Sequence, residues 1–227
     1  MVIQESRWTG QRERRRTEFV DAALAAIAEH GPLTSTEQIA SYVGVTRTKL
    51  YRHFDGAADL QRAVAERAAG MLGAELAPLW TPNGSMGAVI AAAVGAHVRF
   101  LVDHRNLYRY LARCSLDELA SAPDAIADIK LTIGTQLTAL FGVYLAALRA
   151  DVDPEPLAFG IVGLVESTTS RWLDNPTATE DAVVADLVRW IWLLVDDTLR
   201  GAGVHLDRDE PLPAPDEIAA DPGRYRI

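Results

Sequence analysis

The stretch "TSTEQIASYVGVTRTKLYRHF", Thr34 to Phe54, holds the clearest structural signals in the chain. A serine or threonine followed three residues later by an acid or amide predicts a helix start, because the two side chains cap free backbone N–H groups. Two overlapping pairs fit this pattern, Thr34 with Glu37 and Ser35 with Gln38. Both predict a short helix that begins near residue 36.

A second short helix follows after a glycine-containing turn. Gly44 ends the first helix, because glycine readily adopts the left-handed conformation found at helix C-termini. Thr46 can cap the next helix, which we predict from Arg47 to about Phe54, with Leu50 and Phe54 facing the interior. Two short helices joined in this way form a helix-turn-helix unit, here over about residues 35–54.

The second helix of this unit is dense in cations, hydroxyls and rings. Such groups can meet DNA. Arginine and lysine donate to guanine O6 and N7, threonine contacts a base or the thymine methyl, and tyrosine or histidine hydrogen-bonds phosphate. The predicted DNA-binding residues are Thr36, Arg47, Thr48, Lys49, Tyr51, Arg52 and His53. On charge alone, a solvated cationic helix face without a partner explains the pattern equally well.

The chain is acidic as a whole, with a formal net charge of −9, but its charge is unevenly distributed. Residues 1–54 hold eight Arg or Lys against six Asp or Glu, a charge of +2, and the remainder holds fourteen against twenty-five, −11. A second basic cluster, Arg12, Arg14, Arg15 and Arg16, precedes the helix-turn-helix unit. Only the N-terminal part therefore suits a polyanion.

Apolar residues recur with helical spacing along the chain, and the alternating patterns of strands are missing. We therefore predict an all-α fold of about nine helices: residues 11–30, 36–43, 47–54, 58–76, 86–104, 107–113, 124–149, 155–173 and 180–200. Residues 206–227 are proline-rich and acidic, which is typical of a surface or partly disordered tail.

The stretch quoted above resembles the DNA-binding signature of the TetR family of bacterial transcriptional regulators. Ile39-Ala40, Gly44-Val45 and the run from Leu50 to Phe54 match the family pattern in order and spacing. The family usually has a phosphate-binding lysine three residues after the phenylalanine, where this chain has Ala57. Backbone N–H groups at that helix N-terminus can still bind a phosphate. The cluster from Arg12 to Arg16 could compensate, unless it is a solvated, disordered arm.

The resemblance implies a function and a division of the chain. Residues 1–57 would form the DNA-binding domain and residues 58–205 a ligand-binding and dimerisation domain, followed by the tail at 206–227. Such a regulator, most often a repressor, would bind a palindromic operator as a homodimer. It would leave the operator when a small hydrophobic effector displaces the fourth helix. An activator or global DNA-binding protein of the same fold is the alternative within the family.

The middle helices would enclose the effector cavity. Their inner faces offer an apolar and aromatic set that suits a mostly hydrophobic molecule with a few polar groups. The predicted contacts are Phe100, Tyr108, Phe141, Tyr144 and Phe159. Most of these rings would be plain core in any all-α protein. Glycines such as Gly134 and Gly142 either leave room or allow close helix packing, and the sequence leaves both open.

The last two long helices are more apolar than the surface helices of a monomer. Trp190 and the run Ile191–Leu194 place large side chains around much of the final helix. A helix that is apolar nearly all round needs burial on two sides. By resemblance, the second side would be covered by the same helix pair of another subunit. Burial wholly within one domain is the alternative.

The sequence offers no convincing set of catalytic or metal-binding residues. The five histidines show no metal-ligand spacing, Cys114 has no nearby histidine, and no glycine-rich phosphate loop occurs. We therefore predict no catalytic residue, metal or cofactor, with an all-α enzyme or carrier as the rival from another class. The single cysteine suits the cytoplasm, and no uninterrupted apolar run reaches the roughly 18 residues of a membrane span.

Overall fold

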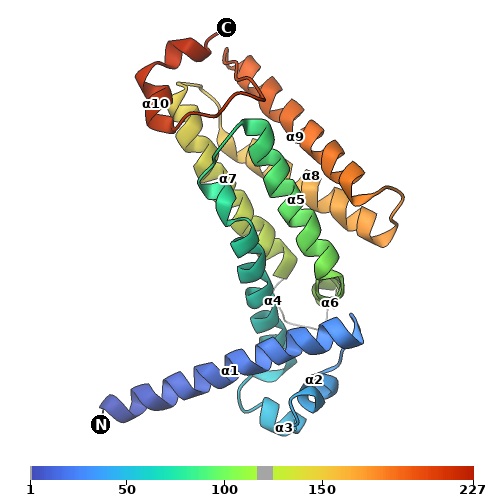
Figure 1. Ribbon diagram of the computed structural model, residues 1–227. Helices are drawn as coiled ribbons and strands as arrows, with labels where there is room; N and C mark the ends of the chain where they lie inside the picture. The colour runs from blue at the N-terminus through green and yellow to red at the C-terminus, as the bar shows by residue number, and fades with distance from the viewer. Residues whose placement is uncertain (1, 117–124) are drawn as a thin grey trace. The chain divides into compact units, whose positions relative to one another are not determined.

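The computed structural model describes the backbone of residues 2–116 and 125–227 and the side chains of residues 11–115 and 126–227. Within these residues the chain is all-α, as predicted, and its only strand-like pairs are two isolated β-bridges. The described residues form ten α-helices: α1 Val2–His30, α2 Thr36–Tyr42, α3 Arg47–Leu50, α4 Gly56–Glu75, α5 Met86–Asp103, α6 Arg105–Leu116, α7 Ala125–Ala147, α8 Pro154–Asp174, α9 Glu180–Gly201 and α10 Pro215–Ala220 (Figure 1).

The chain divides into two compact units. Unit 1 spans Met1–Leu72 and Asp103–Ile129, and unit 2 spans Gly73–Val102 and Lys130–Ile227. This division does not follow the expected boundary between residues 57 and 58. The reason is that most of α4, together with α6, buries its apolar side chains against the N-terminal helices.

Unit 1 is built around the C-terminal half of α1. Phe19, Ala23 and Ile27 are buried there at helical spacing, together with side chains from α2, α4 and α6. The helix ends at His30 because Gly31 has a φ of +88°, and the N–H of Gly31 donates to the Ile27 carbonyl at 2.9 Å. At its other end α1 begins at Val2, earlier than the predicted start at residue 11.

Unit 2 is a bundle of α5, α7, α8 and α9, of which α8 and α9 run antiparallel side by side (Figure 1). The buried face of α9 repeats every four residues through Val183, Leu187, Ile191 and Val195. A short 3-10 helix, Ala77–Trp80, precedes α5. Its Leu79 and Trp80 pack on a smaller apolar cluster between α7 and α8.

Residues 206–227 lie mostly at the surface, as expected for a surface tail, and a few side chains anchor this C-terminal segment to unit 2. Val204 and Ile218 are fully buried in the core of unit 2. Arg226 donates to the carbonyls of Arg149 at 2.6 Å and Ala202 at 3.0 Å, where α7 and α9 end. Free carbonyls at helix C-termini attract a cation. A few apolar residues and one arginine therefore hold this proline-rich, acidic segment against unit 2.

Candidate nucleic-acid interface

The start of α2 is set by a reciprocal pair of hydrogen bonds. The N–H of Gln38 donates to the Ser35 hydroxyl at 3.3 Å, and the N–H of Ser35 donates to the Gln38 side-chain carbonyl at 2.8 Å. Ser35 is therefore the cap, and the sequence had left Thr34 as an equal candidate. The Thr34 hydroxyl instead donates to the Gly31 carbonyl at 2.6 Å and is buried.

The turn between α2 and α3 follows the prediction from sequence. Gly44 has a φ of +65°, which a residue with a Cβ adopts only with strain. The next N–H, of Val45, returns to the Ala40 carbonyl at 2.9 Å. Thr46 then caps α3, because its hydroxyl accepts the N–H of Lys49 at 3.3 Å.

The third helix is shorter than predicted. It ends at Leu50 instead of Phe54, because the N–H groups of Arg52 and His53 bond carbonyls three residues back, Lys49 and Leu50, and form tight turns. The recognition segment, residues 47–55, therefore consists of one helical turn followed by tight turns. Leu50 and Phe54 are buried, as predicted.

The predicted DNA-binding residues differ in exposure. Four lie on the surface and three are half-buried: Arg47, Thr48, Lys49 and Arg52 are exposed, and Thr36, Tyr51 and His53 are half-buried. The recognition segment thus has the expected polarity, with apolar anchors inside and cations and hydroxyls outside. That polarity permits contact with a polyanion.

Arg47 has partners within the protein before any DNA arrives. Its guanidinium pairs with the carboxylate of Glu37, on α2, and lies 5.2 Å from the ring centroid of Tyr51. Both members of the ion pair are more than half exposed. An exposed pair of this kind is weak, so a phosphate or a guanine can displace Glu37.

His53 packs its ring against α1. Its ring lies against Phe19, with centroids 5.1 Å apart, and burial lowers its pKa, aided by the charges of Arg12, Arg15 and Lys49. Its buried Nδ1 has no hydrogen-bond partner among the described residues. The backbone carbonyl of His53 accepts a hydrogen bond from a neighbouring arginine, and the contact of its ring with phosphate stays a prediction.

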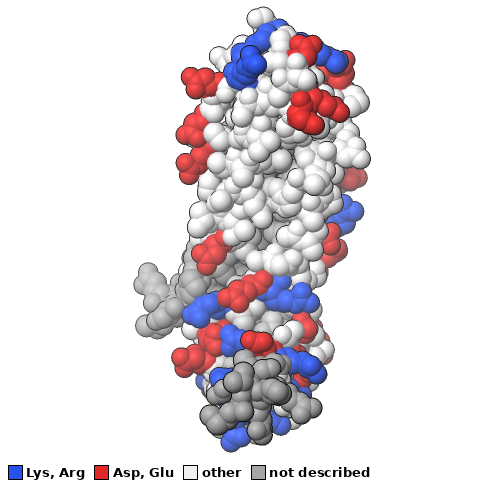
Figure 2. Space-filling view, turned by 90° about the vertical axis from the view of Figure 1, so that its left-hand side faces the viewer, with Lys and Arg blue, Asp and Glu red and all other residues white. Residues whose placement is uncertain are grey.

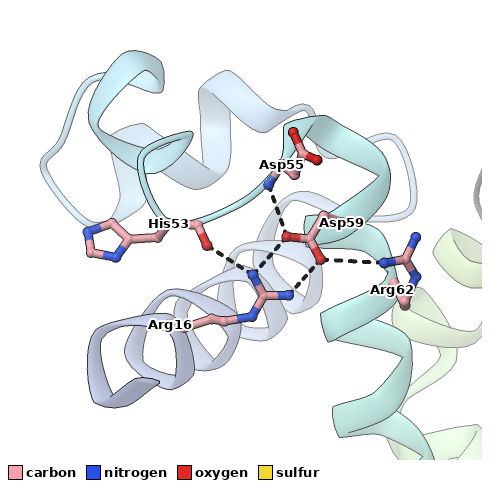
Figure 3. Close-up of polar contacts among 5 residues, drawn as sticks. All are labelled: Arg16, His53, Asp55, Asp59 and Arg62. Carbon is pink, nitrogen blue, oxygen red and sulfur yellow. Dashed lines mark hydrogen bonds and ion pairs between the residues drawn. The ribbon is translucent and has the colours of Figure 1, made fainter. Parts of the chain in front are cut away.

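That arginine, Arg16, differs from the rest of its basic cluster. It donates from both terminal nitrogens to the carboxylate of Asp59, at 2.7 and 2.8 Å, and to the carbonyl of His53 at 2.9 Å (Figure 3). The hydrogen bonds from Arg16 lower the pKa of Asp59 to about 2, against the opposing effect of partial burial. Residues 11–16 lie within α1, so this cluster is helical and not a disordered arm.

Sequence reasoning missed the pairing of Arg16 with Asp59. The two residues lie 43 positions apart, and no local pattern relates them. The only available signal was an acid in the first turn of α4, where the helix dipole favours negative charge. Ala57, where the family usually has lysine, lies in the same turn and is exposed.

The helix-turn-helix geometry agrees with two family matches. Residues 19–64 match the bacterial regulatory proteins of the tetR family, and residues 86–194 match the tetracyclin repressor-like C-terminal domain. Together the matches span more than half of the chain. The chain belongs to the TetR family. It is thus a DNA-binding transcriptional regulator, a class of proteins that are not enzymes.

Two relatives and two solved structures extend the likeness. An HTH-type transcriptional regulator of Mycobacterium tuberculosis is 27% identical over 226 residues, covering 92% of this chain and 89% of its own. The HTH-type transcriptional activator FasR of Mycolicibacterium smegmatis is 24% identical over 188 residues, covering 80% and 83%.

Both solved structures show the same fold. A tetR-family regulator from Streptomyces coelicolor superposes with a TM-score of 0.65 at 21% identity, covering 93% of this chain and 88% of its own. FadR from Bacillus subtilis, solved with stearoyl-CoA, has a TM-score of 0.61 at 19% identity, covering 79% and 97%.

In this TetR-family regulator, the predicted effector contacts do not all belong to one unit. Phe100, Phe141, Tyr144 and Phe159 lie in unit 2, and Tyr108, on α6, lies in unit 1. All five are half-buried. Phe141 packs against both apolar clusters of unit 2, and burial raises the pKa of Tyr144.

The two glycines on α7 differ in what they face. A Cβ added to Gly134 would lie 2.6 Å from the ring of Phe159, so this glycine permits close packing of α7 on α8. A Cβ on Gly142 would meet only Pro154, at 3.9 Å. The sequence had left open whether these glycines leave room or allow close helix packing. The structure shows close packing at Gly134.

A polar group lies among the apolar side chains of unit 2. His97, on α5, has its Nε2 3.5 Å from the hydroxyl of Thr169, on α8, which itself donates to the Val165 carbonyl at 2.7 Å. His97 is half-buried as a residue, and burial of its imidazole lowers the pKa to about 4. His97 is therefore a neutral, hydrogen-bonding group at neutral pH.

Proposed function

We propose that this TetR-family chain is a ligand-responsive repressor that binds a palindromic operator as a homodimer and leaves it when a small hydrophobic effector binds. The observation that carries the DNA-binding part is the polarity of the recognition segment, with Leu50 and Phe54 buried and Arg47, Thr48 and Lys49 exposed. A dimer presents two such segments to two half-sites of a palindrome.

The exposed face of α8 and α9 supports the dimer. Leu193 and Leu194 are 54% and 43% exposed, although large apolar side chains favour burial. On α8, Gly160 and Gly163 face open space, since a Cβ at either position would meet nothing within 4 Å. A second copy of this helix pair could approach closely at the glycines and cover the leucines in a four-helix interface.

The effector is proposed to be mostly hydrophobic. The half-buried rings Phe100, Phe141, Tyr144 and Phe159 of unit 2 would contact it, and neutral His97 of the same unit would offer one hydrogen bond. The complex of Bacillus subtilis FadR with stearoyl-CoA supports a molecule with a long apolar part. Effector binding would displace α4 and change the separation of the two recognition segments.

We propose a cytoplasmic location. By length and composition alone, α5 and α7 could cross a membrane. A core helix of a soluble protein passes the same test, and Val94, Val98 and Leu101 of α5 are buried in unit 2. Operator DNA also lies in the cytoplasm.

The second candidate function is activation of transcription in place of repression. The observation that favours it is the likeness to FasR, which is named a transcriptional activator. Repression and activation require the same DNA interface and differ in where the operator lies relative to the promoter. A reporter gene driven by a promoter that the protein naturally binds, measured with and without the protein, decides between them.

Selection from a random-sequence DNA duplex library tests the proposal. The full-length protein should enrich a palindromic sequence, and compounds from an apolar library should lower its affinity for that duplex. Enrichment without any effector response would remove the ligand-responsive part. No enrichment from repeated selections would overturn the proposal itself.

A further inference from the structure

One guanidinium joins three segments of unit 1 around the end of the recognition segment (Figure 3). Arg16 comes from α1, Asp59 from the first turn of α4, and the His53 carbonyl from the recognition segment itself. The same carboxylate accepts the N–H of Asp55 at 2.9 Å and lies 3.6 Å from Arg62. The link between α3 and α4 is therefore held directly by Asp59 at Asp55 and, through Arg16, at the His53 carbonyl.

The recognition segment depends on such external support. Past Leu50 its backbone forms only tight turns, and it passes into α4 through Gly56, whose φ is +80°. A single helical turn is not stable alone. Phe54 anchors it from inside, and the Arg16 guanidinium covers that ring, 4.5 Å from its centroid.

We propose that Arg16 and Asp59 are positioning residues for DNA recognition, and that Arg16, unlike its neighbours in the basic cluster, is not a phosphate ligand. The inference rests on the proposed function, since it concerns how the recognition segment is held for DNA. Because Asp59 belongs to α4, a shift of α4 relative to α1 must either break the bidentate pair or carry the recognition segment with it. The pair is thus the point at which movement of α4 reaches the DNA-contacting side chains.

For Asp59→Asn, simple electrostatics and the positioning role predict opposite changes in affinity for the selected duplex. Asp59→Asn removes a negative charge near a DNA-binding surface, so charge alone should tighten binding to any duplex. The positioning role predicts weaker binding to the selected duplex and equal or tighter binding to a scrambled one. Arg16→Lys separates charge from geometry in the same way, because lysine keeps the cation but not the planar fork.

The experiment compares wild type, Arg16→Lys, Arg16→Gln, Asp59→Asn and the double variant Arg16→Gln/Asp59→Asn. Affinity for the selected and scrambled duplexes is measured over a series of salt concentrations, at a temperature where circular dichroism shows every variant folded. Hydrogen exchange of the amides in residues 51–56 reports the segment without DNA. Arg15→Gln is the matched control for a plain cation of the same cluster, because Arg15 precedes Arg16 on α1 and pairs with the exposed Glu18. It should lower affinity for both duplexes equally, without added exchange at residues 51–56.

Each single variant at Arg16 or Asp59 should lose about tenfold in affinity for the selected duplex and gain exchange at residues 51–56. The double variant should lose less than the sum of the two single losses, since the two residues share one bidentate ion pair. The salt slope of Arg16→Gln should equal that of wild type. A slope reduced by about one, with equal loss on both duplexes, identifies a phosphate contact and overturns the inference.

Failure of the inference is separate from failure of the proposed function. If wild type enriches no duplex, the proposed function fails, and the positioning role for DNA falls with it. If wild type enriches a duplex and Arg16→Lys binds it with unchanged affinity, only the positioning role is overturned. Unchanged exchange in Asp59→Asn overturns it as well.

Discussion

Arg47 and Arg16 are both arginines of unit 1 with a carboxylate partner, and their surroundings give them different tasks. The Arg47–Glu37 pair is more than half exposed, with side-chain exposures of 55% and 60%. The Arg16–Asp59 pair is 33% and 17% exposed and bidentate. Solvent screens the first pair, which can exchange its carboxylate for DNA, whereas the second is held in a defined geometry.

Arg47 and Glu37 should affect DNA binding in opposite directions. Arg47→Ala should weaken binding to the selected duplex about tenfold or more, because it removes a donor from the recognition segment. Glu37→Gln should tighten binding to all duplexes, since it releases the guanidinium and removes a negative charge. Fluorescence anisotropy at matched salt measures both. Arg67→Ala, which breaks an exposed pair with Asp21, is the control, and equal affinity of Arg47→Ala and wild type would exclude Arg47 from the interface.

His97 should make stability depend on pH. Its pKa is about 4 in the folded protein and 6.5 as the ordinary value, so between these limits the unfolded chain binds a proton that the folded chain does not. The contribution of neutral His97 to the free energy of unfolding is therefore fully present above pH 6.5. It decreases as the pH falls toward 4, by about 1 kcal/mol per pH unit. Urea unfolding across this range measures it.

His97→Gln, which keeps a hydrogen-bonding side chain, should flatten that dependence. His30→Gln, at the exposed end of α1, should leave it as in wild type. If both variants show the wild-type slope, another group is responsible for the acid sensitivity.

At the scale of elements, glycines set how closely helices pack and where they end. Gly31 and Gly44 end helices through positive φ, and Gly134 lets α7 lie against the ring of Phe159. Gly73, inside α4, faces no atom within 4 Å of an added Cβ. Replacement by alanine should therefore change the free energy of unfolding in opposite directions at Gly134 and Gly73.

Gly134→Ala should lower the free energy of unfolding by about 1–3 kcal/mol, because the new methyl forces the Phe159 ring to move. Gly73→Ala should raise it by about 0.5–1 kcal/mol, since alanine lowers the entropy cost of the helix. Thermal and urea unfolding of both variants provide the comparison. Stabilisation by Gly134→Ala would mean that Phe159 has room to move at no cost.

At the scale of the whole molecule, apolar surface remains after each unit has folded. Charged side chains are sparse over the middle of the face shown in Figure 2. Within unit 2, residues 131–148 of the chain contain no Lys, Arg, Asp or Glu, and Leu131 on α7 is 58% exposed. Exposed leucines thus occur on both α7 and α9, and apolarity alone does not say which helix meets a second subunit.

A matched pair of leucine variants tests the proposed interface. Leu193→Asp on α9 should shift the protein toward monomer, because a dimer through α8 and α9 would bury an unpaired carboxylate. Leu131→Asp on α7 makes the same change at a similarly exposed leucine and should leave the dimer intact. Trp192 is half-buried in unit 2, so Leu193 reports the interface with less damage to the fold.

Sedimentation equilibrium of the two folded variants gives the answer. The opposite pattern, with Leu131→Asp monomeric and Leu193→Asp dimeric, would move the interface to α7. Monomeric wild type at all concentrations would contradict the homodimer.

The sequence by itself determined the features that depend on residues a few positions apart. The all-α class, the cap at Thr46, the turn at Gly44 and the inward side chains Leu50 and Phe54 all follow from local hydrogen bonds and helical spacing. The same local pattern carried the resemblance to the TetR family. These signals persist in the folded protein because neighbours along the chain remain neighbours in space.

Only the tertiary structure decided which of several local options was used. Ser35 caps α2 because Thr34 is buried against the end of α1, and Ile218 draws the tail into the core of unit 2. Arg16 meets Asp59 across 43 residues, which changes it from a surface cation into a positioning group. Such contacts depend on where the packed helices place side chains that are distant in sequence. No local pattern along the chain shows which of these side chains come close together in space.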